Sequence, residues 1–287
     1  MFDGFTLEQI VLPDASLRVR HGGTGPPLLL LHGHPRTHAT WHKVAPLLAQ
    51  HFTVVCPDLP GFGKSSIPAD APDHANSSKR AKACDCVDLM AHLGFDRFSL
   101  VGHDRGAYTA FRMAMDHPGV VERLVILDGV PILEALERCD AKFAEKWWHW
   151  FFFRQPDKPE RAILQGPLAW YGATPSQMGA EPFEDYRQAV TNPDVVHGMI
   201  EDYRAGTALD WRHDLADRAA GGTLQCPVLA LWARQDDLED LYGDVLAVWR
   251  PWAPDLRGRG LESGHHMAEE IPEELASEIR AFCLQPR

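Results

Sequence analysis

The chain has 287 residues, of which 45% are hydrophobic and 24% are charged, as in ordinary globular proteins. This length suits a single α/β core that carries an inserted subdomain. The formal net charge is −12. Nucleic acid and anionic membrane surfaces are therefore excluded as expected partners, because both are bound through basic patches.

The N-terminal segment MFDGFTLEQI lacks the basic and apolar regions of a secretory signal. No segment approaches the roughly 18 apolar residues of a membrane-spanning helix. The six cysteines are scattered, without CxxC or metal-ligand spacing, which favours reduced thiols in a cytoplasmic protein. We expect a small-molecule substrate and no metal or other cofactor. The oligomeric state is left open, with a homodimer as one alternative.

Short apolar strands alternate with helices through the first half of the chain. The expected strands cover residues 27–31, 52–56, 98–101 and 123–127, and the expected helices cover 40–50, 79–93 and the stretch that ends at residue 117. This alternation predicts an α/β fold with a mostly parallel sheet that has helices on both faces.

The pattern changes at residue 131, where strands give way to helical stretches dense in aromatic residues, above all at 147–153. A strand at 228–232 and a helix at 238–249 then resume the first pattern. We therefore predict a core from residues 1–130 and 215–287, and an inserted helical cap from 131–214. At most two residues of the aromatic run are expected at a site, because most of its rings should pack against the core.

The strongest chemical signal is the segment Gly102-His103-Asp104-Arg105-Gly106, between an apolar strand and a helix. Small residues on both sides of a central nucleophile allow the tight turn that lifts this side chain above the sheet. A carboxylate attacks a saturated carbon to give an ordinary ester, whereas attack on an acyl carbon would give an anhydride. Asp104 therefore indicates alkyl-ester chemistry. The alternative is an aspartate that caps the following helix.

Hydrolysis of such an ester needs a general base and a group that orients it. His265 follows Gly264 near the C-terminus and is favoured over its neighbour His266 as the base that deprotonates water. Two strand ends supply candidate orienting acids, Asp128 and Asp236. The sequence does not rank these two acids, and Asp237 makes the second one ambiguous by one residue.

The segment His32-Gly33-His34-Pro35 follows the first apolar strand and fits an oxyanion turn. Backbone N–H groups of His34 and Arg105 are expected to hold the oxyanion that forms during ester hydrolysis. The alternative is an ordinary turn that ends a strand at a proline.

These residues resemble the branch of the α/β-hydrolase superfamily that includes haloacetate (fluoroacetate) dehalogenases and bacterial epoxide hydrolases. The matching segments, in chain order, read LLLLHGHPRTHATWHKVAPLLA, DLPGFGKS, VGHDRGA, ILDGVP, WHWFF, EDYRAG and ESGHHMAEE. They span nearly the whole chain. The resemblance implies an α/β-hydrolase fold with a helical cap, Asp104 as nucleophile and His265 as base.

The resemblance extends to the residues that hold the leaving group. It implies that His149, Trp150 and Tyr203 occupy the positions that bind halide in the dehalogenases. It also implies that the acid of the dehalogenases stands at Asp128, whereas an acid at Asp236 is the usual arrangement in epoxide hydrolases.

Arg105 matches one of the two arginines that clamp the substrate carboxylate in haloacetate dehalogenases, but the second arginine is replaced by Tyr108. A bidentate clamp on a small anion is thereby halved. The sequence therefore favours an epoxide hydrolase that opens a small uncharged epoxide to a diol. Tyr203 would donate to the ring oxygen, with His149 preferred over Tyr171 or Tyr108 as a second donor.

A hydrolytic dehalogenase that uses the same aspartate and histidine is the alternative. A non-catalytic binding protein is disfavoured because the nucleophile, the base and candidate acids are all present. An esterase is disfavoured because Asp104 stands where a serine would be required.

Overall fold

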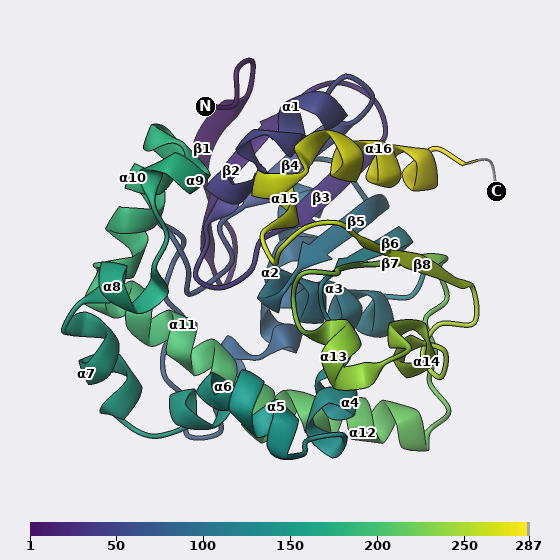
Figure 1. Ribbon diagram of the computed structural model, residues 1–287. Helices are drawn as coiled ribbons and strands as arrows, with labels where there is room; N and C mark the ends of the chain where they lie inside the picture. The colour runs from purple at the N-terminus through teal and green to yellow at the C-terminus, as the bar shows by residue number, and fades with distance from the viewer. Residues whose placement is uncertain (286–287) are drawn as a thin grey trace.

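One mixed sheet forms the centre of the protein in this computed structural model, which describes residues 1–285 (Figure 1). Within that range eight strands run in the order β1-β2-β4-β3-β5-β6-β7-β8. They are β1 (Thr6–Val11), β2 (Ser16–Gly22), β3 (Pro27–Leu31), β4 (Thr53–Pro57), β5 (Phe98–His103), β6 (Val121–Leu127), β7 (Val228–Ala233) and β8 (Leu256–Leu261). β2 pairs antiparallel with β1 and with β4, and the other neighbouring pairs are parallel. The predicted mostly parallel sheet is confirmed.

Helices cover both faces of this sheet because its central strands are apolar on both sides. In β3, Leu28 and Leu30 face one core cluster while Leu29 and Leu31 face the other, as the period of two requires. The first cluster contains residues of α1 (Val44–Leu48), α15 (Met267–Glu270) and α16 (Pro272–Cys283). The second contains residues of α2 (Lys79–His92), α3 (Arg105–Asp116) and α14 (Val245–Trp249).

The structure differs from the predicted elements mainly at exposed or broken segments. The strands β1, β2 and β8 were not predicted, and β1 is exposed at all but one position, so its sequence lacks an apolar run. The predicted helix 40–50 is divided between η1 (His38–His42) and α1. The predicted helix 238–249 is broken at Gly243, whose φ of 66° ends α13 (Leu238–Tyr242) before α14 begins.

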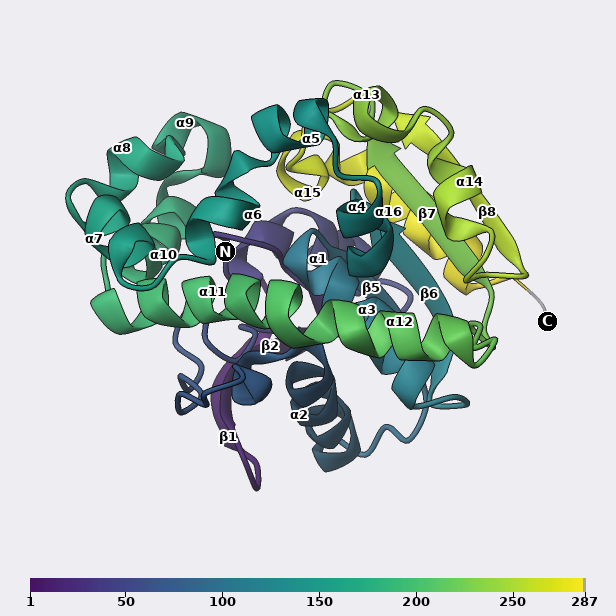
Figure 2. The same cartoon turned by 90° about the horizontal axis from the view of Figure 1, so that it is seen from below.

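A helical region lies between β6 and β7 and covers the carboxyl end of the sheet. It contains α4 (Ile132–Glu137), α5 (Ala141–Lys146), α6 (Trp148–Phe153), α7 (Lys158–Leu164), α8 (Pro167–Tyr171), α9 (Pro175–Met178), α10 (Ala180–Val190), α11 (Pro193–Ala205) and α12 (Trp211–Ala219). A π-helical turn, η3 (Gly206–Asp210), joins α11 to α12, so that they run as one long helix (Figure 2). The cap boundaries at residues 131 and 214 stay a prediction.

A short 3-10 helix, η2 (Ala75–Ser77), precedes α2. Among the helices of residues 1–285, none has the length and apolar character needed to cross a lipid bilayer.

Candidate active site

Asp104 sits at the sharp turn between β5 and α3. Its backbone has φ 48° and ψ −117°, a conformation that L-residues rarely adopt and that stores strain. A Cβ added at Gly102 would lie 2.3 Å from the carbonyl oxygen of Gly106, and one added at Gly106 would lie 2.4 Å from that of Leu31. The backbone therefore passes too closely for larger residues, which is the physical reason for the two glycines.

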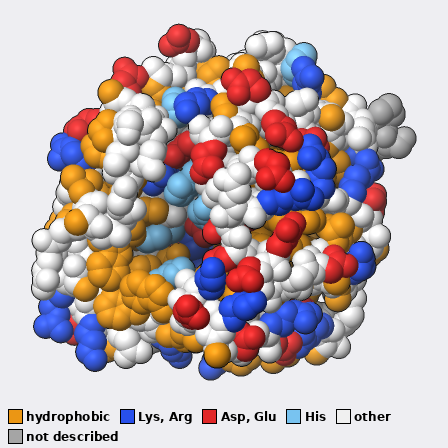
Figure 3. Space-filling view, viewed as in Figure 1, with side chains coloured by type: hydrophobic (Ala, Val, Ile, Leu, Met, Phe, Trp, Pro, Cys, Tyr) orange, Lys and Arg blue, Asp and Glu red, His pale blue; other side chains and the backbone are white. Residues whose placement is uncertain are grey.

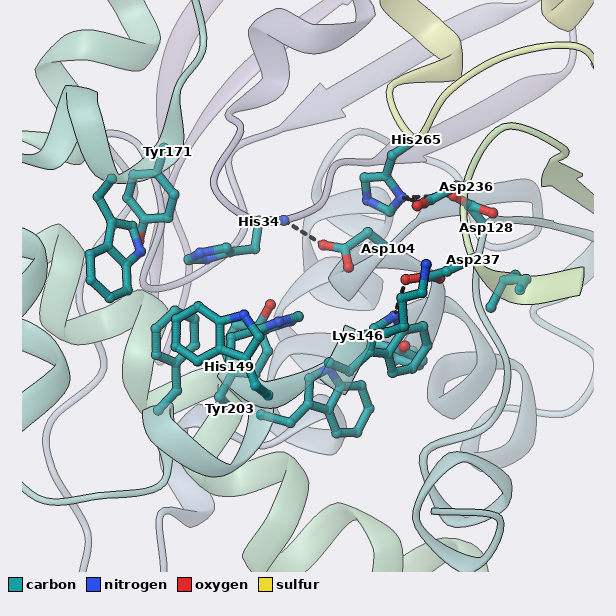
Figure 4. A pocket seen from close by; sticks show the side chains of 17 residues that line it. His34, Asp104, Asp128, Lys146, His149, Tyr171, Tyr203, Asp236, Asp237 and His265 are labelled. Carbon is teal, nitrogen blue, oxygen red and sulfur yellow. Dashed lines mark hydrogen bonds and ion pairs between the residues drawn. The ribbon is translucent and has the colours of Figure 1, made fainter. Parts of the chain in front are cut away.

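The carboxylate of Asp104 does not cap α3, because no side-chain hydrogen bond is made to that helix. It instead accepts a hydrogen bond of 2.6 Å from the backbone N–H of His34 (Figure 4). A Cβ at Gly33 would lie 2.5 Å from the Asp104 side chain, so this turn leaves room only for glycine. The structure thus brings the predicted oxyanion turn to the predicted nucleophile. The predicted role of the Arg105 backbone N–H as a second donor to the oxyanion stays a prediction.

The charge state of Asp104 suits a nucleophile. Burial by itself would raise the pKa of this carboxyl group, but the neighbouring charges of His265 and Arg105 and the hydrogen bond from His34 lower it below its ordinary value. Asp104 is therefore ionised at neutral pH.

His265 lies beside Asp104 and contacts both candidate acids (Figure 4). Its Nδ1 is 2.7 Å from Oδ2 of Asp128 and 2.8 Å from Oδ2 of Asp236. These acids follow β6 and β7, whose parallel pairing places their carboxyl ends at one edge of the sheet. The ambiguity with Asp237 is resolved, because that carboxylate accepts a hydrogen bond from Trp147 Nε1 at 2.7 Å instead.

Two carboxylates around one N–H cannot both be ionised without cost. Burial raises the pKa of Asp128 to about 7, whereas hydrogen bonding to His265 lowers the pKa of Asp236 although burial opposes this. For His265, burial is outweighed by hydrogen bonds to both acids and by the charge of Asp104, so its pKa lies well above the ordinary value. The two acids therefore titrate as a pair, in which one carboxylate stays ionised beside His265 and the other is more easily protonated.

Among the described residues, three side chains beside Asp104 lie close enough together to hold a metal ion, namely His103, Asp128 and His265. Asp128 is engaged with His265, and Nε2 of His103 is 2.8 Å from the backbone carbonyl oxygen of His265. These groups already form hydrogen bonds with one another, which agrees with a network that orients His265.

Asp104 and His265 face a cavity of about 330 Å³ between the sheet and the helical region. Small-molecule sites span roughly 300–1,000 Å³, so this cavity has the size of a ligand site. On the surface, histidine side chains are visible in a hollow that hydrophobic side chains border on one side and charged side chains on the other (Figure 3).

The predicted pocket residues come together in this cavity. His149, Trp150, Tyr203 and Tyr108 all contribute to its lining. Their two phenol groups, one indole N–H and one imidazole belong to side chains that line the cavity, where a ligand can contact them. Trp150 and Tyr203 are each only 3% exposed, so hydrogen bonds from them to a ligand would form away from bulk water.

The aromatic run contributes more to the site than predicted. At most two site residues were expected from the run, and five of its seven residues line the cavity: Trp147, Trp148, His149, Trp150 and Phe153. These five residues differ widely in exposure, from 50% at Trp148 to 3% at Trp150, so they line the cavity from its rim to its interior.

Arg105 is bonded to Asp202 and does not line the cavity, and its part in binding a substrate carboxylate stays a prediction. Its Nε donates to Asp202 at 2.6 Å and its Nη2 donates to the Asp202 carbonyl at 3.0 Å. The guanidinium lies 3.9 Å from the ring centre of Tyr203, which itself lines the cavity. The Arg105 side chain is thus buried behind the aromatic wall and paired with a carboxylate that the sequence did not single out.

Comparisons with known proteins agree with this geometry. A family model described as alpha/beta hydrolase fold matches residues 26–271. The chain belongs to the α/β hydrolase fold family. This membership accounts for the strained turn at Asp104 and for the helical region inserted after β6.

Relatives within the family divide between two chemistries. The chain is 41% identical to a fluoroacetate dehalogenase from Burkholderia sp, over 100% of the chain and 96% of that protein. It is 33% identical to a soluble epoxide hydrolase from Corynebacterium sp. (strain C12), over 88% of the chain and 87% of that protein. A structure from Nostoc sp PCC 7120, provisionally described as an alpha/beta hydrolase, superposes with a TM-score of 0.96 at 41% identity and covers 100% of both chains.

This α/β hydrolase is therefore an enzyme of the branch that contains fluoroacetate dehalogenases and epoxide hydrolases. The similarities favour the dehalogenase alternative over the epoxide hydrolase that the sequence analysis favoured. The preference for an epoxide hydrolase rested on the missing second arginine, the aromatic cap and the position of Asp236, whereas the match to the dehalogenase extends over the whole chain.

Proposed function

We propose that this α/β hydrolase is a hydrolytic dehalogenase that displaces halide from a small organic halide through an ester on Asp104. The observation that carries the proposal is the placement of three hydrogen-bond donors, His149, Trp150 and Tyr203, in the cavity that Asp104 faces. The similarity to a fluoroacetate dehalogenase over the whole chain supports the same reaction.

In the first half-reaction, a carboxylate oxygen of Asp104 attacks the saturated carbon that carries the halogen. A carbon–oxygen bond forms, and the electron pair of the carbon–halogen bond leaves with the halide. The halide accepts hydrogen bonds from the indole N–H of Trp150, the imidazole of His149 and the hydroxyl of Tyr203. A halide is a weak base, so these donors need only stabilise its charge and no proton is transferred.

In the second half-reaction, water attacks the carbonyl carbon of the Asp104 ester while His265 accepts a proton from it. The oxyanion that forms occupies the position of the Asp104 oxygen bonded to the His34 N–H. Collapse breaks the bond to the alkoxide, which takes the proton from His265 and leaves as the alcohol. The acid left on Asp104 then ionises, so the net products are alcohol, halide and one proton.

The charges of the site make His265 available as a base only after the first half-reaction. Asp104 raises the pKa of His265 as long as it carries its negative charge. Ester formation removes that charge, so the pKa of His265 falls and its proton is released more readily. The base is therefore activated at the point where the second half-reaction needs it.

An epoxide hydrolase is the second candidate function, and a specific feature favours it. The phenol groups of Tyr203 and Tyr108 both reach the cavity, and an epoxide oxygen leaves as a basic alkoxide that needs strong donors. The contact of Asp236 with His265 agrees with this candidate as well.

The test is mass spectrometry of the Asp104 peptide from His265→Ala protein, with Asp104→Asn/His265→Ala protein as the control. Samples are incubated with 1-chlorobutane, 3-chloro-1-propanol, chloroacetamide, chloroacetate or cyclohexene oxide. Without the base the second half-reaction stops, so we expect an ester whose added mass equals that of the substrate less one molecule of hydrogen halide. Turnover by the His265→Ala protein should be at least about 100-fold slower than turnover by native enzyme.

A mass gain equal to an intact epoxide, with no adduct from any halide, would replace the proposal by the second candidate. Halide release by native enzyme without an adduct in the His265→Ala protein would contradict the ester mechanism itself. Adducts that persist in the control would place the nucleophile elsewhere.

A further inference from the structure

Two polar side chains of the cavity have no role in the mechanism above. Both ring nitrogens of His34 and the hydroxyl of Tyr171 are buried, and none of them has a hydrogen-bond partner in residues 1–285. The two rings meet edge to face, with 5.1 Å between their centres. Both residues line the cavity that Asp104 faces. Buried polar groups are nearly always hydrogen-bonded, so this pair points to a ligand group that bonds to the polar atoms of both rings.

The pair lies at a definite place relative to the reacting carbon. The His34 ring points from Asp104 toward Tyr171, on the side opposite to His265 (Figure 4). His34 is fixed there because its own backbone N–H bonds to Asp104. A substrate whose reacting carbon sits at Asp104 can therefore extend its other end toward these two side chains.

The pair is also uncharged. Burial lowers the pKa of His34 to about 3, so its imidazole is neutral and offers one donor and one acceptor. Burial raises the pKa of Tyr171, so its hydroxyl keeps its proton. Such groups match a hydroxyl or an amide, which likewise both donates and accepts.

The remaining charges of the cavity disfavour an anionic substrate. Four carboxyl side chains contribute to the lining, against one lysine, Lys146. That lysine is half-exposed and lies 3.8 Å from Asp240. The guanidinium of Arg105 donates to Asp202 and does not line the cavity, although its Nη1 has no hydrogen-bond partner within residues 1–285.

We propose that His34 and Tyr171 form a subsite for an uncharged hydrogen-bonding group, a hydroxyl or a primary amide, on the organic halide that the enzyme hydrolyses. The inference rests on the proposed dehalogenase function and adds the substrate class. The enzyme would accordingly prefer a neutral, polar halide to a haloacetate.

Two pairs of nearly isosteric substrates test this preference in the native enzyme by halide release. 3-Chloro-1-propanol and 1-chlorobutane differ by a hydroxyl in place of a methyl group, and chloroacetamide and chloroacetate differ by a neutral amide in place of a carboxylate. We expect a higher kcat/KM for the first member of each pair, by about three- to tenfold for each hydrogen bond gained.

The variants His34→Phe and Tyr171→Phe remove the polar atoms and keep the rings. Each should lower the ratio of kcat/KM for 3-chloro-1-propanol over 1-chlorobutane by about three- to tenfold. Tyr242→Phe is the matched control, because its hydroxyl is also buried without a partner within residues 1–285 but Tyr242 does not line the cavity. A ratio measured within one variant is insensitive to a general loss of folded protein.

The outcomes separate the two proposals. Equal kcat/KM for the members of both pairs in native enzyme would overturn the subsite, and so would ratios that the His34 and Tyr171 variants leave unchanged. If native enzyme released halide from none of the four substrates, this result would instead count against the dehalogenase function.

Discussion

Two carboxylates share the Nδ1–H of His265, and this sharing decides how each should respond to substitution. Asp128 and Asp236 are equally close to that nitrogen, at 2.7 and 2.8 Å. The sequence could not rank them, since each follows a strand at the same sheet edge. The structure gives the physical reason, because neither acid excludes the other. Like charges at this distance hold one proton between them.

We therefore expect the two acids to substitute for each other. In Asp236→Asn protein, Asp128 loses its like-charged neighbour, so its pKa falls and it ionises in its place. Each single variant, Asp128→Asn or Asp236→Asn, should lower kcat less than about tenfold. The double variant should lose at least about 100-fold, toward the roughly 10⁴-fold loss known for removal of a sole orienting acid.

The pH dependence of kcat adds a second measurement to this comparison. Removal of both carboxylates lowers the pKa of His265, so the acid limb of the double variant should move to lower pH even as the maximum falls. A single variant that alone shows the full loss would mean that one acid does the work.

Where the chemistry is local in sequence, the structure brings the predicted side chains together, and their catalytic roles stay predictions. The spacing around Asp104 and the Gly-His pair at His265 placed both side chains at one cavity. The partner of Arg105 was missed, because Asp202 lies 97 residues away and only the fold brings them together. The polar ring atoms of His34 were also missed, since a sequence shows the turn but not the direction of its side chain.

At the scale of elements, the strand-turn-helix unit of β5 and α3 carries strain for the sake of function. The φ of 48° at Asp104 belongs to the region that favours glycine, and such strain costs about 1–3 kcal/mol. The sequence predicted this unit because glycines flank a strand end. It could not predict β1 and β8, whose exposed residues carry no apolar pattern.

Glycine usually stabilises a folded protein less than alanine does, and the opposite order at position 104 should reveal this strain. We expect Asp104→Gly protein to have a free energy of unfolding about 1 kcal/mol higher than Asp104→Ala protein, because only glycine relaxes at this φ. Ala110→Gly, within α3, is the control and should lower the free energy of unfolding by about 1 kcal/mol relative to native protein. Urea titrations measure all of these values. Greater stability of the Asp104→Ala protein would show that the turn is not strained.

On the scale of the whole molecule, a buried ion cluster ties the helical region to the sheet-flanking helices. Asp202 on α11 accepts bonds of 2.6 Å from Lys79 and from Lys82 on α2, and one of 2.6 Å from Arg105 on α3. Asp202 and both lysines are each at most 1% exposed in their side chains. Three cations around one carboxylate outweigh its burial and hold the pKa of Asp202 well below its ordinary value.

Loss of this carboxylate should therefore destabilise the whole fold. Asp202→Asn leaves buried cations without their shared partner, which typically costs about 3–5 kcal/mol of unfolding free energy. The control is Glu184→Gln, which breaks the exposed ion pair with Arg187 and should cost at most about 1 kcal/mol. Urea unfolding at pH 7 compares the two variants with native protein.

The contribution of Asp202 to stability should depend on pH. The folded state holds Asp202 ionised at pH values where the unfolded chain, with a pKa of about 3.9, binds a proton. Its contribution is therefore complete above about pH 5 and is lost only as pH falls toward the lower pKa of the folded state. Burial lowers the pKa of Lys79 to about 7, and loss of the Asp202 charge would lower it further, so the stability gap between native and Asp202→Asn protein should widen as pH falls from 8 to 5 and narrow below pH 4. A gap that disappears already between pH 8 and pH 6 would contradict an ionised Asp202 as the link between the helical region and the core.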